Sequence, residues 1–138
     1  MREIVSRALI TRENDFLICR RKGSDYWFLP GGHIDPGENG KDALIRELRE
    51  ERGSEIEISA FVGVIENFFE QNNQKICEIN LIFQVLELGK MDERASKEDH
   101  LEFKFIKLND FEKENVLPRA LKNGIVQWIQ DEKPFYLC

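Results

Sequence analysis

The alternation of apolar and polar residues along the chain predicts several strands and two helices. Residues 4–10 and 16–20 are short apolar runs separated by a turn-prone segment, which is typical of a hairpin. Residues 60–69 and 76–88 are predicted to form two longer strands, and residues 102–108 a shorter one. Within 76–88 apolar and polar residues alternate, so we expect this part of the sheet to be buried on one face only.

Two other segments have the periodicity of helices. Between residues 39 and 52 apolar side chains recur four residues apart; Asn39 is a suitable N-cap, and Gly53 can end the helix. A second helix is expected over 117–129, where Gly124 would allow close packing. The predicted order of elements is strands, helix, strands, helix. This order predicts an α/β domain with a mixed sheet covered on both sides.

Length and composition point to one ordinary domain over residues 1–138. No apolar run approaches the length of a membrane span, and the first residues lack the apolar stretch of a secretory signal, so we expect a cytoplasmic location without membrane contact. The three cysteines, Cys19, Cys77 and Cys138, show no metal-ligand spacing and are expected to be reduced.

The formal charge of −6 argues against a nucleic-acid polymer as partner, because such binding needs a basic surface. It does not argue against a small phosphorylated molecule. A bound metal ion can reverse the local field, so an acidic protein can still bind a polyanion at one place.

A concentrated acidic pattern lies in the first predicted helix. Glu47, Glu50 and Glu51 are three and four residues apart, so their carboxylates project from neighbouring points of one helical face. Like charges placed in this way repel one another. The face is therefore either solvated or holds divalent cations, and hard oxygen ligands suit Mg²⁺ or Mn²⁺.

The surrounding residues resemble the Nudix box. The matching positions are Gly32, five residues, Glu38, seven residues, and then Arg46-Glu47-Leu48-Arg49-Glu50-Glu51-Arg52-Gly53. Only Ser54 departs from the pattern, because an aliphatic residue is usual there. The resemblance implies a Nudix-type α/β/α sandwich with a mixed central sheet, in which the box forms a loop-helix-loop motif.

The resemblance also implies an Mg²⁺- or Mn²⁺-dependent hydrolase that cleaves the diphosphate linkage of a nucleoside diphosphate joined to another moiety. By this resemblance the metal ligands are Glu47, Glu50, Glu51 and the carbonyl of Gly31. Arg46 is expected to orient neighbouring glutamates through charge-assisted hydrogen bonds, and Glu38 to support the site. The general base and the number of metal ions stay open.

A further carboxylate is expected from outside the box, because members of the family commonly complete the site with an acid from a distant loop or strand end. The polar stretch 96–102 is the predicted source. Glu98 is the preferred ligand since its loop position can adapt to an ion, whereas Glu102, at a strand start, would be fixed by pairing.

Substrate selectivity is expected to come from residues 20–27, 66–75 and 91–100, since the box handles only the shared diphosphate. The candidate contacts are Trp27, Arg20 and Glu66. An aromatic side chain such as Trp27 could stack on a base, but core packing is the favoured alternative.

Other functions remain open at this point. A Nudix domain could bind and sense a nucleotide or sugar-nucleotide without turnover, although such a domain has no physical reason to keep three repelling carboxylates. An isomerase of a prenyl diphosphate and a hydrolase of RNA 5′-ends are further alternatives on the same fold. The sequence leaves the nucleotide and the oligomeric state undecided; many members of the family are homodimers.

Overall fold

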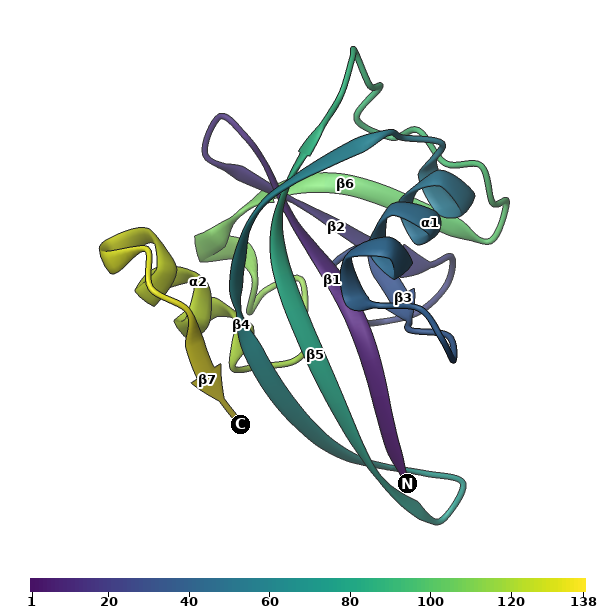
Figure 1. Ribbon diagram of the computed structural model, residues 1–138, viewed down its shortest axis with the longest axis vertical. Coiled ribbons are helices and arrows are strands. Elements are labelled where there is room, and N and C mark those ends of the chain that lie inside the picture. The colour runs from purple at the N-terminus through teal and green to yellow at the C-terminus, as the bar shows by residue number, and fades with distance from the viewer.

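A computed structural model describes residues 1–138, and its centre is a mixed seven-stranded sheet (Figure 1). The strands are β1 (Arg2–Arg12), β2 (Asp15–Arg21), β3 (Gly31–His33), β4 (Ile56–Gln71), β5 (Gln74–Glu87), β6 (Leu101–Lys107) and β7 (Phe135–Leu137). Their order is β6-β2-β1-β5-β4-β7, with β3 also beside β1. β1 is parallel to β5 and β4 to β7; the other pairs are antiparallel.

The sheet divides at β1. One side of β1 pairs with β5 along most of its length. On the other side, the first half of β1 pairs with β3 and its end pairs with β2 in the predicted hairpin. This fork places Gly31 and Gly32 opposite Arg7 and Ser6, near the middle of the sheet.

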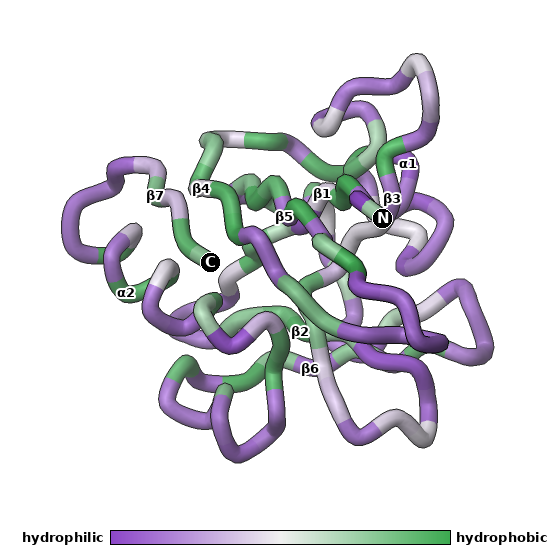
Figure 2. Tube along the Cα trace, turned by 90° about the horizontal axis from the view of Figure 1, so that it is seen from below, coloured by the Kyte–Doolittle hydropathy of each residue, from purple (hydrophilic) through white to green (hydrophobic).

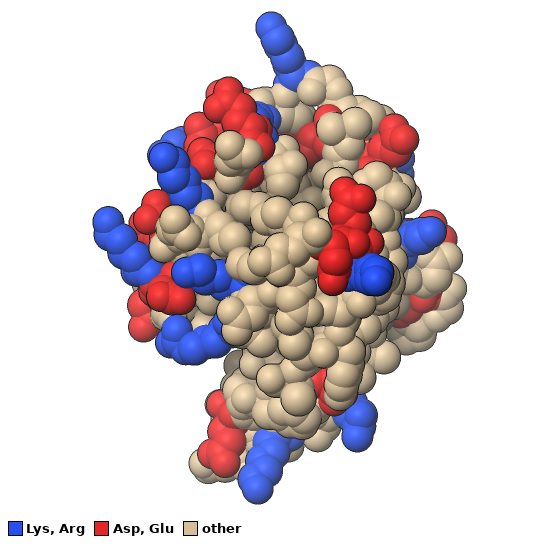
Figure 3. Space-filling model, turned by 90° about the vertical axis from the view of Figure 1, so that its left-hand side faces the viewer, with Lys and Arg blue, Asp and Glu red and all other residues tan.

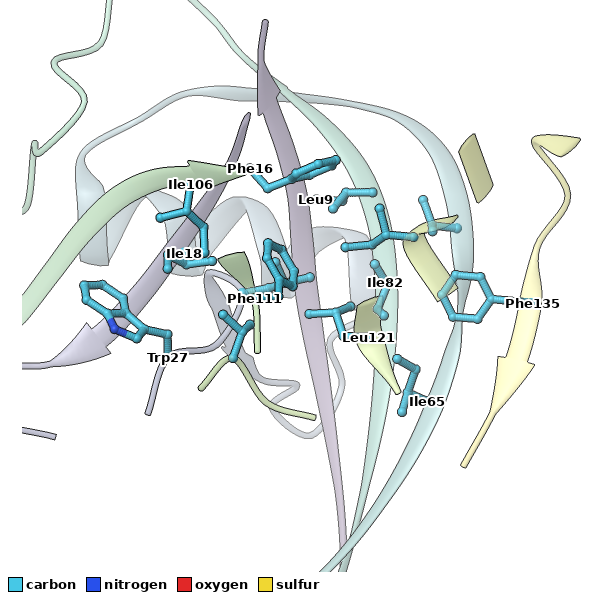
Figure 4. Close-up of a cluster of buried hydrophobic side chains, with 14 residues drawn as sticks. Leu9, Phe16, Ile18, Trp27, Ile65, Ile82, Ile106, Phe111, Leu121 and Phe135 are labelled. Atoms are coloured by element: carbon cyan, nitrogen blue, oxygen red, sulfur yellow. The ribbon is translucent and has the colours of Figure 1, made fainter. Parts of the chain in front are cut away.

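Two helices, α1 (Gly40–Arg52) and α2 (Leu121–Asp131), cover opposite faces of the sheet (Figure 1). Under α1, Leu44 and Leu48 belong to one apolar cluster. Under α2, Leu121 and Ile125 belong to a second one, drawn in Figure 4. The strands are largely apolar and the connecting loops largely polar (Figure 2). The expected α/β/α sandwich with a mixed sheet is confirmed.

The helix α1 begins and ends where the sequence predicts. The side chain of Asn39 accepts a hydrogen bond from the backbone N–H of Asp42 at 2.9 Å, which satisfies one of the free donors at the helix start. At the other end Gly53 has a φ of 72°, and its N–H bonds back to Arg49. A residue without Cβ adopts this left-handed conformation at little cost.

The strand β5 differs from its prediction, because both of its faces are covered. Asn80 and Ile82, on the face expected to be exposed, are each only 1% exposed. The expectation of a half-buried strand was therefore wrong. The cause is α2 and its flanking segments, which pack on this face; Trp128 even donates from Nε1 to the Gln84 side chain at 3.0 Å.

The C-terminal region also contains an element that the sequence did not predict. α2 begins at Leu121, later than expected, and the chain after it forms the short strand β7 beside β4. The ring of Phe135 in β7 packs directly on Gly124, where an added Cβ would lie 2.5 Å from ring carbon Cζ. The close packing expected at Gly124 is confirmed.

Two further predictions concerned membrane-spanning segments and the state of the cysteines. No helix in the structure is long and apolar enough to cross a membrane. All three cysteines are free thiols; Cys19 and Cys77 are buried and Cys138 is exposed.

Candidate active site

The turn into β3 brings backbone unusually close to side chains of α1. Gly31 has a φ of 135°, and a Cβ there would lie 2.0 Å from the carbonyl oxygen of Ser6. At Gly32 a Cβ would lie 2.6 Å from the carboxyl carbon of Glu47. Both positions therefore require glycine, the first because of the neighbouring strand and the second because a glutamate of α1 packs on the turn.

The three glutamates of α1 lie in different environments. Glu51 is buried with 8% exposure, and the side chain of Glu47 is 17% exposed. The side chain of Glu50 is 54% exposed. Viewed along the helix axis, Glu47 lies between Glu50 and Glu51. Glu47 and Glu51 are on the side of the helix that is buried, and Glu50 is on the side that is exposed.

Glu51 has an unusual electrostatic environment. Burial, together with the neighbouring charge of Glu47, raises its pKa to about 8, although the charge of Arg7 and the Gly31 backbone N–H act in the opposite direction. Its Oε1 is buried and has no hydrogen-bond partner. Burial also raises the pKa of Glu47. A buried carboxylate oxygen without a partner is costly, which points to a ligand that completes the site.

Arg46 connects the loop before α1 to the helix itself. Its guanidinium donates to Glu38 at 2.8 and 2.9 Å, to Glu47 at 3.0 Å and to Glu50 at 3.4 Å. It also donates to the carbonyl oxygen of His33 at 3.1 Å. Hydrogen bonding from Arg46 lowers the pKa of Glu38 to about 2. The structure thus brings together all five box residues expected to act: Glu38, Arg46, Glu47, Glu50 and Glu51.

The two acids considered outside the box have different surroundings. Glu98 lies on the loop between β5 and β6, and its carboxylate is 3.4 Å from Nε2 of His100. Its charge also contributes to raising the pKa of Glu51. Glu102 forms an ion pair with Arg20 across neighbouring strands. Of the two acids, only Glu98 acts on the pKa of Glu51, and its role as a ligand stays a prediction.

Trp27 lies in the core under α2 with 4% exposure (Figure 4). Its ring is covered by the guanidinium of Arg20 at 4.5 Å and the ammonium of Lys104 at 4.6 Å. Arg20 in turn bonds to Glu102 and, at 3.0 Å, to the carbonyl oxygen of Ser24. These contacts support the alternative that Trp27 is a core residue.

Glu66, the third candidate substrate contact, lies on β4. Its carboxylate accepts a hydrogen bond from the hydroxyl of Tyr136 in β7. β5 and β1 lie between β4 and β3, and three strand spacings correspond to about 14 Å. The structure does not bring Glu66 beside the glycines of β3.

One residue near the glutamates was missed in the sequence. Arg7 lies opposite Gly31 in the sheet, and its Nη1 donates to the carbonyl oxygen of Leu29 at 3.2 Å. Its charge lowers the pKa of both Glu47 and Glu51. The sequence feature that could have identified Arg7 is its position as a charged residue within the apolar run 4–10.

The oxygen ligands that the acidic side chains offer fit a divalent cation. Its groups are carboxylates, the hard oxygen ligands that Mg²⁺ and Mn²⁺ prefer, and one of them, Glu51, has a buried oxygen without a partner. No group of three or more acidic, His or Cys side chains is already arranged to hold an ion. Arg46 holds Glu47 and Glu50 by hydrogen bonds, so a cation would have to compete with its guanidinium for them.

Comparisons with known proteins agree with this geometry. A family model described as NUDIX domain matches residues 1–129. A putative 8-oxo-dGTP diphosphatase of Bacillus subtilis (strain 168) is 35% identical over 68 residues, covering 49% of this chain and 46% of that protein. An ADP-ribose pyrophosphatase of Methanocaldococcus jannaschii is 27% identical over 108 residues, covering 76% and 62%. The chain thus spans only about half of the length of these curated relatives.

Solved structures show the same fold. The crystal structure of a MutT NUDIX hydrolase from Burkholderia pseudomallei matches with a TM-score of 0.70 and 22% identity, over 92% of this chain and 98% of that chain. The glycine turn, the acidic helix and the family model that spans residues 1–129 lead to one conclusion, that this chain belongs to the Nudix family.

Proposed function

We propose that the protein is an Mg²⁺- or Mn²⁺-dependent hydrolase that cleaves the diphosphate linkage of a nucleoside diphosphate joined to another moiety. The observation that carries this proposal is Glu51, whose buried oxygen lacks a partner. It lies beside Glu47 and close to the Gly31 backbone, in the motif typical of the family. A domain that only senses a nucleotide gains nothing from so costly a carboxylate.

Each box residue then has a defined task. The proposed ligands of the cation are Glu47, Glu50, Glu51, Glu98 and the carbonyl oxygen of Gly31. When bound, divalent cations neutralise phosphate charge and lower the pKa of a coordinated water. Arg46 orients Glu47 and Glu50 through its hydrogen bonds, and Glu38 fixes Arg46 through two bonds of its own.

The substrate class follows from what the named relatives share. An 8-oxo-dGTP diphosphatase and an ADP-ribose pyrophosphatase, by their names, act on different nucleotides. Both nucleotides contain a nucleoside diphosphate, and we extend only that common unit to this protein. Trp27, Arg20 and Glu66 are the least supported substrate contacts, since each is already engaged within the protein.

We propose a small-molecule partner in the cytoplasm, without a nucleic-acid polymer. The net charge of −6 opposes attraction to a polyanionic chain. On the face shown in Figure 3, acidic and basic side chains are interspersed, without a continuous basic stripe. The oligomeric state is best measured directly, by light scattering.

The test is hydrolysis of a substrate panel by the purified protein. The panel contains ADP-ribose, dinucleoside polyphosphates, ordinary and oxidised nucleoside triphosphates, and nucleotide sugars, each with Mg²⁺, with Mn²⁺ and with excess EDTA. Glu50→Gln keeps the size of the side chain and removes the charge that holds a cation. We expect it to lower kcat on the best substrate by at least about 100-fold, since the loss of one metal-ligating charge removes several kcal/mol of transition-state stabilisation.

Glu57→Gln is the matched control, because Glu57 is an exposed glutamate of β4 outside the box. Its rate should equal that of the unchanged protein. Full activity in EDTA, or full activity of Glu50→Gln, would refute a metal-dependent mechanism at this helix. Tight nucleotide binding without turnover of any panel member would instead support the sensor alternative.

A further inference from the structure

Arg52 is the last residue of α1, and every N–H group of its guanidinium donates a hydrogen bond within the protein. Its side chain is 0% exposed, and that of its ion-pair partner Glu87 is 6% exposed. Nε and Nη2 donate to the Glu87 carboxylate at 2.7 and 3.1 Å. Nη1 donates to the carbonyl oxygens of Glu93 and Ala95 at 3.0 Å, and Nη2 to that of Asp92 at 3.1 Å. All five N–H donors of an arginine are thereby used.

Three of these five bonds go to one segment, the loop of residues 88–100 that connects β5 to β6. An ion pair with Glu87 alone would use only two donors. A planar guanidinium with donors on three nitrogens can bind three carbonyl oxygens and a carboxylate together, whereas the compact ammonium of a lysine cannot. Arg52 therefore binds the backbone of this loop as well as the carboxylate of Glu87.

The next part of the loop continues along the end of α1 (Figure 1). The backbone N–H of Lys97 donates to the carbonyl oxygen of Glu51 at 2.9 Å. The aliphatic stem of Lys97 packs over Gly53, where an added Cβ would lie 2.6 Å from Cε. The loop thus contacts the same helical turn that carries Glu51.

Glu98 follows Lys97 directly. Its backbone is tied to the docked segment, because the Ser96 hydroxyl donates to the Glu98 carbonyl at 2.8 Å and accepts from the Glu98 N–H at 3.3 Å. We propose that Arg52 is a positioning residue, which docks residues 88–100 on the end of α1 and so holds Glu98 beside Glu51 for binding of a divalent cation. This inference rests on the proposed function, in which Glu98 is a metal ligand.

The proposed positioning role predicts a measurable change in metal affinity. Groups that orient metal ligands without touching the ion typically change metal affinity about 10–100-fold when they are removed. We therefore expect loss of the Arg52 contacts to weaken Mn²⁺ binding about 10-fold. Mn²⁺ is the suitable probe, because its binding to the substrate-free protein is measured by electron paramagnetic resonance without any turnover.

The variant must remove the docking contacts and leave the protein folded. Arg52→Met alone would leave Glu87 buried and unpaired, which is strongly destabilising. Arg52→Met with Glu87→Met replaces the buried pair by apolar side chains, an exchange that is often neutral for stability. This double variant should unfold near the wild-type temperature and bind Mn²⁺ about 10-fold more weakly.

Glu98→Gln decides whether Arg52 acts through Glu98. In the Glu98→Gln background the double variant should cause no additional loss of Mn²⁺ affinity, because the ligand that Arg52 positions is already absent. Arg49→Met is the matched control. Arg49 lies three residues earlier on α1, and its guanidinium pairs at 2.7 Å with the exposed carboxylate of Glu55 rather than with a residue of the loop, so the Mn²⁺ affinity of this variant should be unchanged.

Three results would overturn the inference. They are wild-type Mn²⁺ affinity in the folded double variant, an equal loss in the presence and absence of Glu98→Gln, and wild-type affinity of Glu98→Gln itself. If the double variant does not fold, Arg52→Lys decides, with severalfold weaker Mn²⁺ binding expected and unchanged binding counting against the proposal. A wild-type protein that binds Mn²⁺ but hydrolyses no nucleotide would refute the proposed function alone.

Discussion

The carboxylate of Glu51 is the most informative single group in this protein. It is buried, and one of its oxygens has no hydrogen-bond partner. Most buried polar atoms in proteins are paired, so an unpaired one in an otherwise well-packed sheet and helix calls for a functional reason. In the metal-free protein we expect this group to make the stability depend on pH.

We expect the metal-free protein to become less stable as the pH rises from 5 to 8.5. Burial raises the pKa of Glu51 from 4.5 to about 8 in the folded protein, so the folded state binds more protons than the unfolded state between these values. The stability contribution of the protonated group is complete below pH 4.5 and is lost as the pH rises through 8. The change is a few kcal/mol at most, since one pKa unit corresponds to about 1.4 kcal/mol.

Urea denaturation in EDTA at both pH values measures this effect. Glu51→Gln should remove most of the pH dependence, because a neutral amide has no proton to lose. Glu57→Gln, the exposed control, should keep it. A pH dependence that is identical in Glu51→Gln and the wild type would show that other groups cause it.

The second prediction at this scale concerns Trp27. Trp27→Ala should destabilise the protein by about 3–5 kcal/mol and lower the rates for all substrates by the same factor, because the ring fills the core under α2. Thermal unfolding and a substrate panel measure the two effects. Tyr26→Ala, a change at the 43% exposed neighbour, should affect stability little. Altered relative rates at unchanged stability would make Trp27 a substrate contact instead.

The sequence predicted which box residues lie close together but not their environments. Spacing alone places Glu47, Glu50 and Glu51 on one helical face. It does not say that Glu51 is buried while Glu50 is exposed, because that difference depends on how α1 is rotated against the sheet. The contacts of Arg7 and Arg52 were not predicted either, because the sequence around a single arginine does not reveal partners many residues away.

At the scale of elements, α1 was predictable because its signals are local. Its N-cap, its terminal glycine and its apolar spacing all lie within the helix or next to it. The strand β7 and the covered face of β5 were not predictable in this way. β7 has three residues, too few for a period. Ile82 is buried in a cluster with Leu121 and Ile125 of α2, an element about 40 positions later in the chain.

The contact between α2 and β7 leads to a third prediction. Gly124→Ala should lower the unfolding temperature, although alanine favours a helix over glycine by about 1 kcal/mol. The new methyl group would lie 2.5 Å from the Phe135 ring, and such overpacking costs about 1–3 kcal/mol. Asn123→Ala, at the exposed neighbouring position of α2, should raise the unfolding temperature slightly. A stabilised Gly124→Ala variant would mean that β7 packs less closely than described.

At the scale of the whole molecule, two apolar clusters share one sheet. The cluster under α1 and the cluster under α2 both contain residues of β1, β2 and β5. Neither can therefore be exposed without disturbing strands that line the other. We infer that the chain unfolds in a single cooperative step.

Leu48→Ala tests this cooperativity. Leu48 is 0% exposed under α1, and its truncation should cost about 2–5 kcal/mol. Both tryptophans lie on the opposite face of the sheet, in or against the cluster under α2. Tryptophan fluorescence and far-ultraviolet circular dichroism should therefore shift to the same lower unfolding temperature. A fluorescence transition that stays at the wild-type temperature would show that the two faces unfold separately.

Arg46 gives the acidic helix a counter-ion of its own. Its guanidinium already neutralises part of the charge of Glu38, Glu47 and Glu50 within the folded chain. Small zinc domains, by contrast, stay unfolded until their ion arrives. We therefore expect the chain to fold before it meets any cation, and to stay folded when the proposed ions are removed. Supply of the cation would then control the activity of the protein and leave its abundance unaffected.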